Sequence, residues 1–278
     1  AAFYGCSLLK NINIPDNTSV SEYQLFYGCK SLENVTFGDN TISAVDQNTF
    51  YGCNALKTVT FGTGLTEIKF GSFENKTNLT EVTFAGEVGF IGSNAFIYCY
   101  NLDRINNLNS VGGFGANAFY SCGLSEFEIP VGPTSIPEAC FYGCNFKNIT
   151  IPASVKSIGA QAFSNCSLES ITIPATVTNI NSYAFANCSN VKSITIEGSE
   201  TQFATNSFSC GSNLEVINSP YSSSDKRCLI KDNELYLFAP AGLTEYTLPS
   251  YIKTIKSSVF SNNKLLENIT IPNSVTTI

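Results

Sequence analysis

The sequence contains no histidine, no methionine and no tryptophan among its 278 residues. The absence of histidine excludes Ser-His-Asp triads, Cys-His dyads and zinc sites that use imidazole ligands. The chain also has no phosphate-binding loop of the form G-x-x-x-x-G-K-[ST] and no calcium-binding loop with EF-hand spacing. We therefore predict that the protein is not an enzyme, and we expect no catalytic residues, no metal site and no cofactor.

Charge is scarce as well. Charged residues make up 13% of the chain, about half the usual share, and the formal net charge is −7. No basic run is longer than Lys226 and Arg227, so the concentrated footprint that nucleic acid requires is missing. No stretch approaches the roughly 18 uninterrupted apolar residues of a membrane-spanning helix. We expect neither a nucleic-acid partner nor insertion into a membrane.

What the sequence does contain is one short unit, repeated along its length. A phenylalanine marks each copy, and successive copies lie 22 to 24 residues apart except for one interval of 52. A unit this short cannot bury its apolar side chains alone, so the copies must stack into a solenoid. Ala1 and Ile278 fall inside a repeat, which indicates a piece of a longer array. The eleven anchors are Phe3, Phe26, Phe50, Phe73, Phe96, Phe119, Phe141, Phe163, Phe185, Phe208 and Phe260.

The copy at residues 162–180 shows how each unit is organised. An L-x-x-I-x-I run extends from Leu168 to Ile173, and its second half alternates polar and β-branched residues. This alternation predicts a short strand. Pro174 ends the strand, because proline cannot donate into a ladder. A second apolar pair follows at residues 177 and 180. We expect successive strands to lie parallel, about 4.8 Å apart.

The residues after each phenylalanine predict a tight turn. The second residue is most often glycine or asparagine, which favour the left-handed conformation. We interpret the cysteine that often follows as a small apolar filler. The alternative is a disulfide between neighbouring coils, since Cα atoms about 5 Å apart are within range. Mostly unpaired thiols would favour a reducing or anaerobic setting. The eight copies with this cysteine contain Cys6, Cys29, Cys53, Cys99, Cys122, Cys144, Cys166 and Cys188.

The full pattern A-F-x-x-C-x-x-L-x-x-I-x-I-P-x-x-V-x-x-I resembles the BspA-like leucine-rich repeat, also called the Treponema pallidum type. The resemblance covers nearly the whole chain. It implies a mainly β leucine-rich-repeat solenoid, a curved right-handed coil with a parallel concave sheet and short irregular or 3-10 convex segments. It also implies bacterial or protist cell-surface proteins that adhere to matrix proteins or other cells. No catalytic motif comes with the family.

We predict a single solenoid of about eleven coils over residues 1–278, with a hairpin island at 217–248. The long interval of 52 residues contains this island. Its segments Cys228–Lys231 and Glu234–Phe238 flank Asp232 and Asn233, which predicts a β-hairpin. We interpret the island as part of the fold. A protrusion that contacts a ligand is the alternative, since insertions in solenoids often lie on a binding face.

The outward-facing strand positions give the first candidate site. Glu81, Arg104 and Glu126 come from three consecutive coils, so we expect them to stack as a Glu–Arg–Glu ladder with Glu128 beside it. The neighbouring column places Thr83 and Asn106 next to the ladder. One interpretation is stabilisation between coils, worth about 0–1 kcal/mol per exposed pair. The other is a polar patch that binds a ligand.

Tyrosines give a second candidate surface. A tyrosine follows the anchor phenylalanine in five copies, all in the first half of the chain. An aromatic stripe of this kind is typical of surfaces that dock a protein partner. The alternative is that each ring shields the turn beneath it. The five residues are Tyr4, Tyr27, Tyr51, Tyr120 and Tyr142.

Together these features favour a binding protein. We predict a non-enzymatic adhesion protein, extracellular or on the cell surface, that presents its concave face to a protein or glycan ligand. The alternative is a cytoplasmic scaffold repeat protein that mediates protein–protein interaction, which the abundant thiols would suit.

Overall fold

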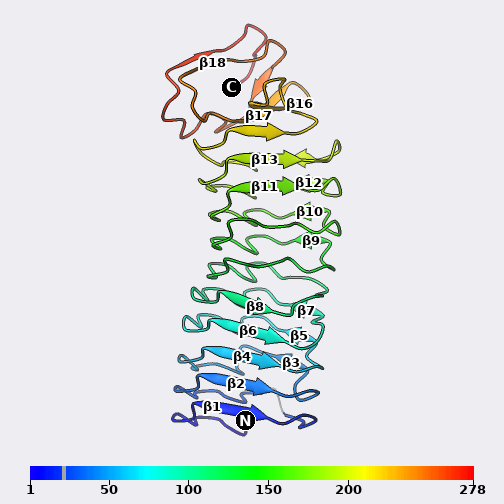
Figure 1. Cartoon of the computed structure of the whole chain (residues 1–278), viewed down its shortest axis with the longest axis vertical. Helices are drawn as coiled ribbons and strands as arrows, with labels where there is room; N and C mark the ends of the chain where they lie inside the picture. The colour runs from blue at the N-terminus through cyan, green and yellow to red at the C-terminus, as the bar shows by residue number, and fades with distance from the viewer. Residues whose placement is uncertain (21–22) are drawn as a thin grey trace.

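The computed structural model describes residues 1–20 and 23–278, and the chain winds into a column of stacked coils (Figure 1). The N-terminus lies at one end of the column and the C-terminal residues lie at the other, with the repeats in order between them. Strands of neighbouring coils pair in parallel, and no described residue is helical. The mainly β solenoid predicted from the repeat is confirmed.

The L-x-x-I-x-I half of the coils forms short strands on one side of the column, which we call the long-strand face. In β11 (Ser170–Ile173), Ile171 and Ile173 are buried while Thr172 is exposed, as the alternation predicts. The other strands of this face are β1 (Asn11–Ile14), β2 (Asn34–Phe37), β4 (Thr58–Phe61), β6 (Glu81–Phe84), β8 (Arg104–Asn106), β13 (Ser193–Ile196), β15 (Val216–Asn218), β18 (Glu245–Thr247) and β20 (Asn268–Thr270).

The V-x-x-I half forms a second set of strands, each two residues long, on the short-strand face. The expected 3-10 segments are absent from the described residues; turns and these strands take their place. The reason is that identical coils in register bring their main chains together here too, as Ile158 and Ile180 show. The strands are β3 (Ala44–Val45), β5 (Glu67–Ile68), β7 (Phe90–Ile91), β9 (Ser135–Ile136), β10 (Ser157–Ile158), β12 (Asn179–Ile180), β14 (Gln202–Phe203) and β19 (Thr254–Ile255).

Ladders on both faces explain the shape of the column. A β-ladder sets about 4.8 Å between neighbouring strands wherever it forms. Because both faces carry such a ladder, the coils are nearly parallel and the column runs almost straight in Figure 1. The curvature implied by the resemblance is therefore slight.

The anchor phenylalanines form a third edge of the coils, which we call the turn edge. Their rings stack from coil to coil with centroids 4.9 to 5.7 Å apart. Each buried ring contributes about 2–3 kcal/mol by burial alone, as is usual for a large apolar side chain. The second residue after the anchor has a positive φ in all copies but one, from Gly5 to Asn262, and the exception is Cys210. The predicted left-handed turn is confirmed.

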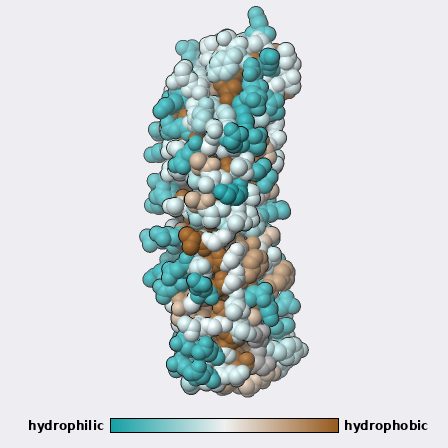
Figure 2. All heavy atoms as spheres, turned by 90° about the vertical axis from the view of Figure 1, so that its right-hand side faces the viewer, coloured by the Kyte–Doolittle hydropathy of each residue, from teal (hydrophilic) through white to brown (hydrophobic). Residues whose placement is uncertain are grey.

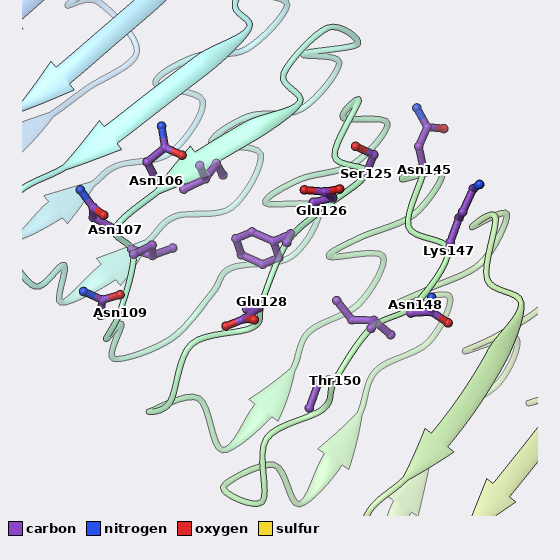
Figure 3. Close-up of a pocket in the computed structure, with 14 residues that line it drawn as sticks. Asn106, Asn107, Asn109, Ser125, Glu126, Glu128, Asn145, Lys147, Asn148 and Thr150 are labelled. Atoms are coloured by element: carbon purple, nitrogen blue, oxygen red, sulfur yellow. The ribbon is translucent and has the colours of Figure 1, made fainter.

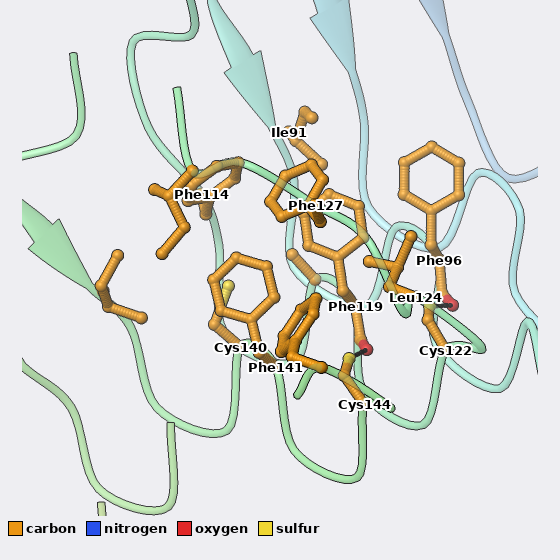
Figure 4. Packing of buried hydrophobic residues seen from close by; sticks show 14 of the residues in the cluster. Ile91, Phe96, Phe114, Phe119, Cys122, Leu124, Phe127, Cys140, Phe141 and Cys144 are labelled. Carbon is orange, nitrogen blue, oxygen red and sulfur yellow. Dashed lines mark hydrogen bonds between the residues drawn. The ribbon is translucent and has the colours of Figure 1, made fainter. Parts of the chain in front are cut away.

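The cysteines of the repeat have a more specific role than filling space. All eleven thiols are free, and the thiols of the turn edge donate to the carbonyl oxygen of an anchor phenylalanine in the preceding coil. Figure 4 shows two of these bonds, from Cys122 to Phe96 and from Cys144 to Phe119. The donor–acceptor distances are 3.0 to 3.6 Å for Cys29, Cys53, Cys99, Cys122, Cys144, Cys166, Cys188 and Cys210.

Little of the apolar core reaches the surface. The face seen in Figure 2 is mostly polar, with a narrow and broken line of hydrophobic residues along it. One cluster of buried residues extends from Ile14 to Ala239, and a second gathers the C-terminal coils, from Cys228 to Val259. The two clusters meet at the predicted hairpin.

The hairpin is confirmed, with β16 (Cys228–Lys231) antiparallel to β17 (Glu234–Phe238). Asp232 and Asn233 both have positive φ, as a tight type I′ turn requires. Leu229 and Leu237 pack into the first cluster, whereas Ile230 and Leu235 pack into the second. The hairpin is therefore buried on both faces and separates the two clusters. The island boundaries at 217–248 and the single domain over 1–278 stay predictions.

Candidate ligand-binding surface

The long-strand face has an interruption in its middle. One sheet ends at β8 and the next begins at β11, and the two coils between them contribute no strand. Residues 125–130 and 148–151 make no backbone–backbone hydrogen bond within the part of the chain that the structure describes. Their main-chain N–H and C=O groups are free to bind water or a ligand.

The same coils remain attached at the turn edge. Phe119 donates its N–H to Cys140 at 2.8 Å, and Phe141 donates to Ala162 at 2.9 Å. The rings of Phe119 and Phe141 also stack, with centroids 5.4 Å apart. The coils are thus joined at the turn edge and, through the pairing of β9 with β10 and of β10 with β12, at the short-strand face. They are separate at the long-strand face.

The repeat shortens in this part of the chain. Anchors Phe119, Phe141, Phe163 and Phe185 lie 22 residues apart. One residue separates Cys122 from Leu124, where the full pattern has two, and the same holds for Cys166 and Leu168 in the coil that forms β11. The shortening alone therefore does not account for the interruption.

A pocket with a volume of about 810 Å³ opens at the interruption (Figure 3). Side chains from three consecutive coils surround it, with amides and two carboxylates around an apolar floor. The volume falls within the range of about 300–1,000 Å³ that is usual for ligand pockets. Its lining consists of Ile105, Asn106, Asn107, Leu108, Asn109, Ser125, Glu126, Phe127, Glu128, Asn145, Lys147, Asn148, Ile149 and Thr150.

Three of the residues expected at the patch line this pocket, namely Asn106, Glu126 and Glu128. Both glutamates are exposed. Within the described part of the chain neither carboxylate accepts a hydrogen bond or forms an ion pair, and the Lys147 ammonium forms no ion pair either. The pocket therefore holds two unneutralised carboxylates and one cation.

The other three expected residues, Glu81, Thr83 and Arg104, lie beside the pocket on β6 and β8. Glu81 pairs in register with Arg104, and Thr83 pairs with Asn106. The Asn106 amide donates to the Glu81 carboxylate, and to the Thr83 hydroxyl at 3.3 Å.

The predicted Glu–Arg–Glu ladder needs correction, because Glu126 has no place in a strand ladder. The ion pair of Arg104 is with its neighbour Asp103, at 3.8 Å, and not with either glutamate. The physical reason is the separation of the coils after β8. Glu126 belongs to the pocket instead.

The tyrosines form two separate stacks instead of one stripe. Tyr4, Tyr27 and Tyr51 stack with centroids 5.1 and 4.7 Å apart, and Tyr120 stacks on Tyr142 at 4.4 Å. Glu74 and Ile97 occupy the positions between the stacks, so the stripe is broken. Burial first, and the neighbouring phenols second, raise the pKa of Tyr27 and of Tyr120.

A buried lysine near the first stack was missed by the sequence prediction. Lys76 takes the cysteine position of its coil and is only 8% exposed. Its ammonium donates to the Glu74 carbonyl at 3.1 Å, and burial lowers its pKa. It lines a second pocket of about 570 Å³ together with Tyr51 and Glu74. The departure from cysteine was visible in the sequence, but the burial was not.

The described residues contain no group of three or more Cys, Asp or Glu side chains placed to hold a metal ion. They also form no helix with the length and apolar character needed to cross a lipid bilayer.

The stacked parallel coils, the stacked phenylalanines and the repeated turn define a leucine-rich-repeat solenoid. A family model described as the BspA type leucine rich repeat region matches six copies over residues 1–103, 112–227 and 230–278. The chain belongs to this family, as its repeat pattern predicted. The unmatched residues 104–111 include Arg104 and part of the pocket lining.

The chain is similar to several solved structures, and the first of them shares this fold. A leucine-rich repeat protein from Bacteroides ovatus is 18% identical with a TM-score of 0.62, over 97% of this chain and 82% of that one. A leucine rich cell surface protein from Faecalibacterium prausnitzii is 22% identical with a TM-score of 0.46, over 94% and 79%. The T. pallidum leucine-rich repeat protein is 19% identical with a TM-score of 0.34, over 61% and 77%. No curated protein matches the chain in sequence.

Proposed function

We propose that the protein is a non-enzymatic adhesion protein of the cell surface, which binds a protein or glycan ligand through its long-strand face. The observation that carries the proposal is the 810 Å³ pocket at the interruption of that face. Unpaired main-chain groups, amide side chains and two free carboxylates meet there, where a regular coil would present only a closed ladder. Membership of the BspA-type family supports binding as the activity and the cell surface as the location.

The proposed binding residues are the six of the predicted patch. Glu126, Glu128 and Asn106 would contact the ligand in the pocket. The residues Glu81, Thr83 and Arg104 would form its border on β6 and β8. The two tyrosine stacks at the turn edge are a second proposed docking surface, because large exposed rings such as Tyr51 favour protein contacts.

An array of extracellular-matrix proteins and glycans, probed with the whole chain, tests the proposal. The pocket variant combines three substitutions, Glu126→Gln, Glu128→Gln and Asn106→Ala. It should bind any ligand found on the array about tenfold or more weakly than the wild type, as is usual when central residues of an interface are replaced. Glu67→Gln in β5 is the matched control, since it removes a carboxylate from the short-strand face. Tyr27→Ala/Tyr51→Ala tests the turn edge separately. Unchanged affinity in both the pocket and the tyrosine variants would refute the proposed surfaces.

A cytoplasmic scaffold is the second candidate, favoured by one observation: all eleven cysteines are free thiols. Fractionation of the source cells distinguishes the two. Surface labelling of the protein on intact cells supports the adhesion protein, and labelling only after lysis supports the scaffold.

A further inference from the structure

The interruption leaves the main chain of two coils open on the long-strand face. The segments at 126–129 and 148–151 lie where neighbouring coils have strands, yet they make no backbone–backbone hydrogen bond within the described residues. Phe127, Ile129 and Ile151 on these segments are buried, so the adjacent peptide groups border the core. Unpaired strand edges of this kind are templates for the addition of another strand.

Two carboxylates flank a buried residue at the pocket. Glu126 and Glu128 are exposed on either side of Phe127, and both line the pocket. Neither carboxylate has a partner in the described part of the chain. A peptide in an extended conformation places alternate side chains on one face, so basic residues at alternate positions would approach both carboxylates. The net charge of −7 attracts such a peptide over a longer range.

The rest of the lining suits a peptide better than a sugar. Asn107, Asn109 and Asn145 offer amide groups that hydrogen-bond to peptide groups in both directions. The single aromatic residue of the lining, Phe127, is only 8% exposed, so no open ring face is available for a sugar to stack on.

We propose that the groove binds an extended segment of a partner protein by strand addition, with basic side chains at alternate positions paired with Glu126 and Glu128. This inference rests on the proposed function of the long-strand face and names its ligand class. Main-chain bonds to the open segments supply affinity, and the two carboxylates select the charge of the segment.

Fluorescein-labelled peptides of eight residues test the inference by fluorescence anisotropy with the whole chain. A Lys-Thr alternating peptide should bind at least tenfold more tightly than Glu-Thr and Ser-Thr peptides. Glu126→Gln/Glu128→Gln should weaken the Lys-Thr peptide by about three- to tenfold, the range for two exposed ion pairs. Glu67→Gln on β5 is the control and should leave the affinity unchanged.

A second peptide tests the main-chain contacts independently of charge. N-methylation at alternate residues removes N–H donors and keeps every positive charge, so binding should fall by about tenfold or more. Equal binding of the methylated peptide would overturn strand addition. Equal binding of the Lys-Thr and Glu-Thr peptides would overturn the charge selection.

The outcomes separate this inference from the proposed function. If a glycan binds and loses affinity in the pocket variant while no peptide binds, the peptide inference fails and the long-strand face remains the binding surface. If a protein or glycan binds the wild type and the pocket variant with equal affinity, the proposed function of that face fails as well.

Discussion

Lys76 is the residue with the most unusual surroundings in the column. It stands where eight other coils have cysteine, and the neighbouring coils place Cys53 and Cys99 near its ammonium. The only hydrogen bond of the ammonium in the described part of the chain is to the Glu74 carbonyl. Burial disfavours the charged form, which lowers the pKa of Lys76 below its ordinary 10.5, and burial raises the pKa of both thiols to about 12.

Replacement of Lys76 by methionine should stabilise the protein near neutral pH. Between the lowered pKa of the folded state and 10.5, the unfolded chain holds a proton that the folded chain has released. The free energy of unfolding of the wild type therefore rises with pH in that window, and the cost of the charge is fully present below it. Lys76→Met should be about 1 kcal/mol more stable at pH 7 and should lack this rise.

Urea unfolding of both proteins at pH 7 and at pH 9.5 measures the effect. The thiols and phenols that titrate in alkaline solution are common to the two proteins, so they cancel in the difference. A constant difference between pH 7 and pH 9.5 would contradict the assignment of a lowered pKa to Lys76.

Residue types predicted some backbone details and not others. Glycine and asparagine after most anchors predicted the left-handed turn, since few other residues adopt it without strain. A second left-handed position, two residues before many anchors, was not predicted. It holds residues as different as Ala139, Gln161 and Tyr183, so no residue type marks it. There the stacking of the coils imposes the conformation.

At the scale of elements, the main-chain amides of the two coils between β8 and β11 should be the least protected from hydrogen exchange on the long-strand face. We expect main-chain amides at 126–129 and 148–151 to exchange with solvent at least about tenfold faster than those of β4 and β6. The expectation holds even though Phe127 and Ile129 are buried, because a buried side chain does not protect an amide that has no acceptor.

Hydrogen–deuterium exchange with mass spectrometry measures this directly. Peptides that cover β4 and β6 serve as the internal control within the same sample. Equal protection in both regions would mean that the ladder is closed in solution, and the groove would then be absent.

The strands of the long-strand face were largely predictable, because polar and apolar residues alternate along them. The hairpin followed from two β-rich segments around Asp232 and Asn233. The interruption was not predicted, since Glu126 and Glu128 alternate with apolar residues as any strand does. For the candidate site, the sequence predicted a ladder that includes Glu126, whereas the structure places Glu126 in the lining of a pocket. The binding role of these residues stays a prediction.

At the scale of the whole molecule, the column has two hydrophobic clusters joined by the hairpin. In a solenoid, each coil is stabilised mainly by its neighbours, so a destabilising substitution should loosen only the coils around it. Leu235 is fully buried in the second cluster and Leu56 is fully buried in the first. Leu235→Ala should cost about 2–5 kcal/mol and should loosen residues 245–278 while the first cluster stays protected.

Hydrogen exchange along the chain distinguishes local from global loosening. Leu56→Ala is the matched variant, and it should accelerate exchange in the N-terminal coils but not in the C-terminal ones. Faster exchange along the whole column in the Leu235 variant would show that the two clusters unfold as one unit.

The turn edge has a consequence for how the protein responds to force. The hydrogen bonds between coils, including those from cysteine thiols to phenylalanine carbonyls, run along the axis of the column. Under a force along that axis, we therefore expect the coils to detach one at a time. Between β8 and β11 the turn edge and the short-strand face carry the load with no help from the long-strand ladder. We expect the column to bend there first. The groove on the long-strand face would then widen while the turn edge and the short-strand face stay joined.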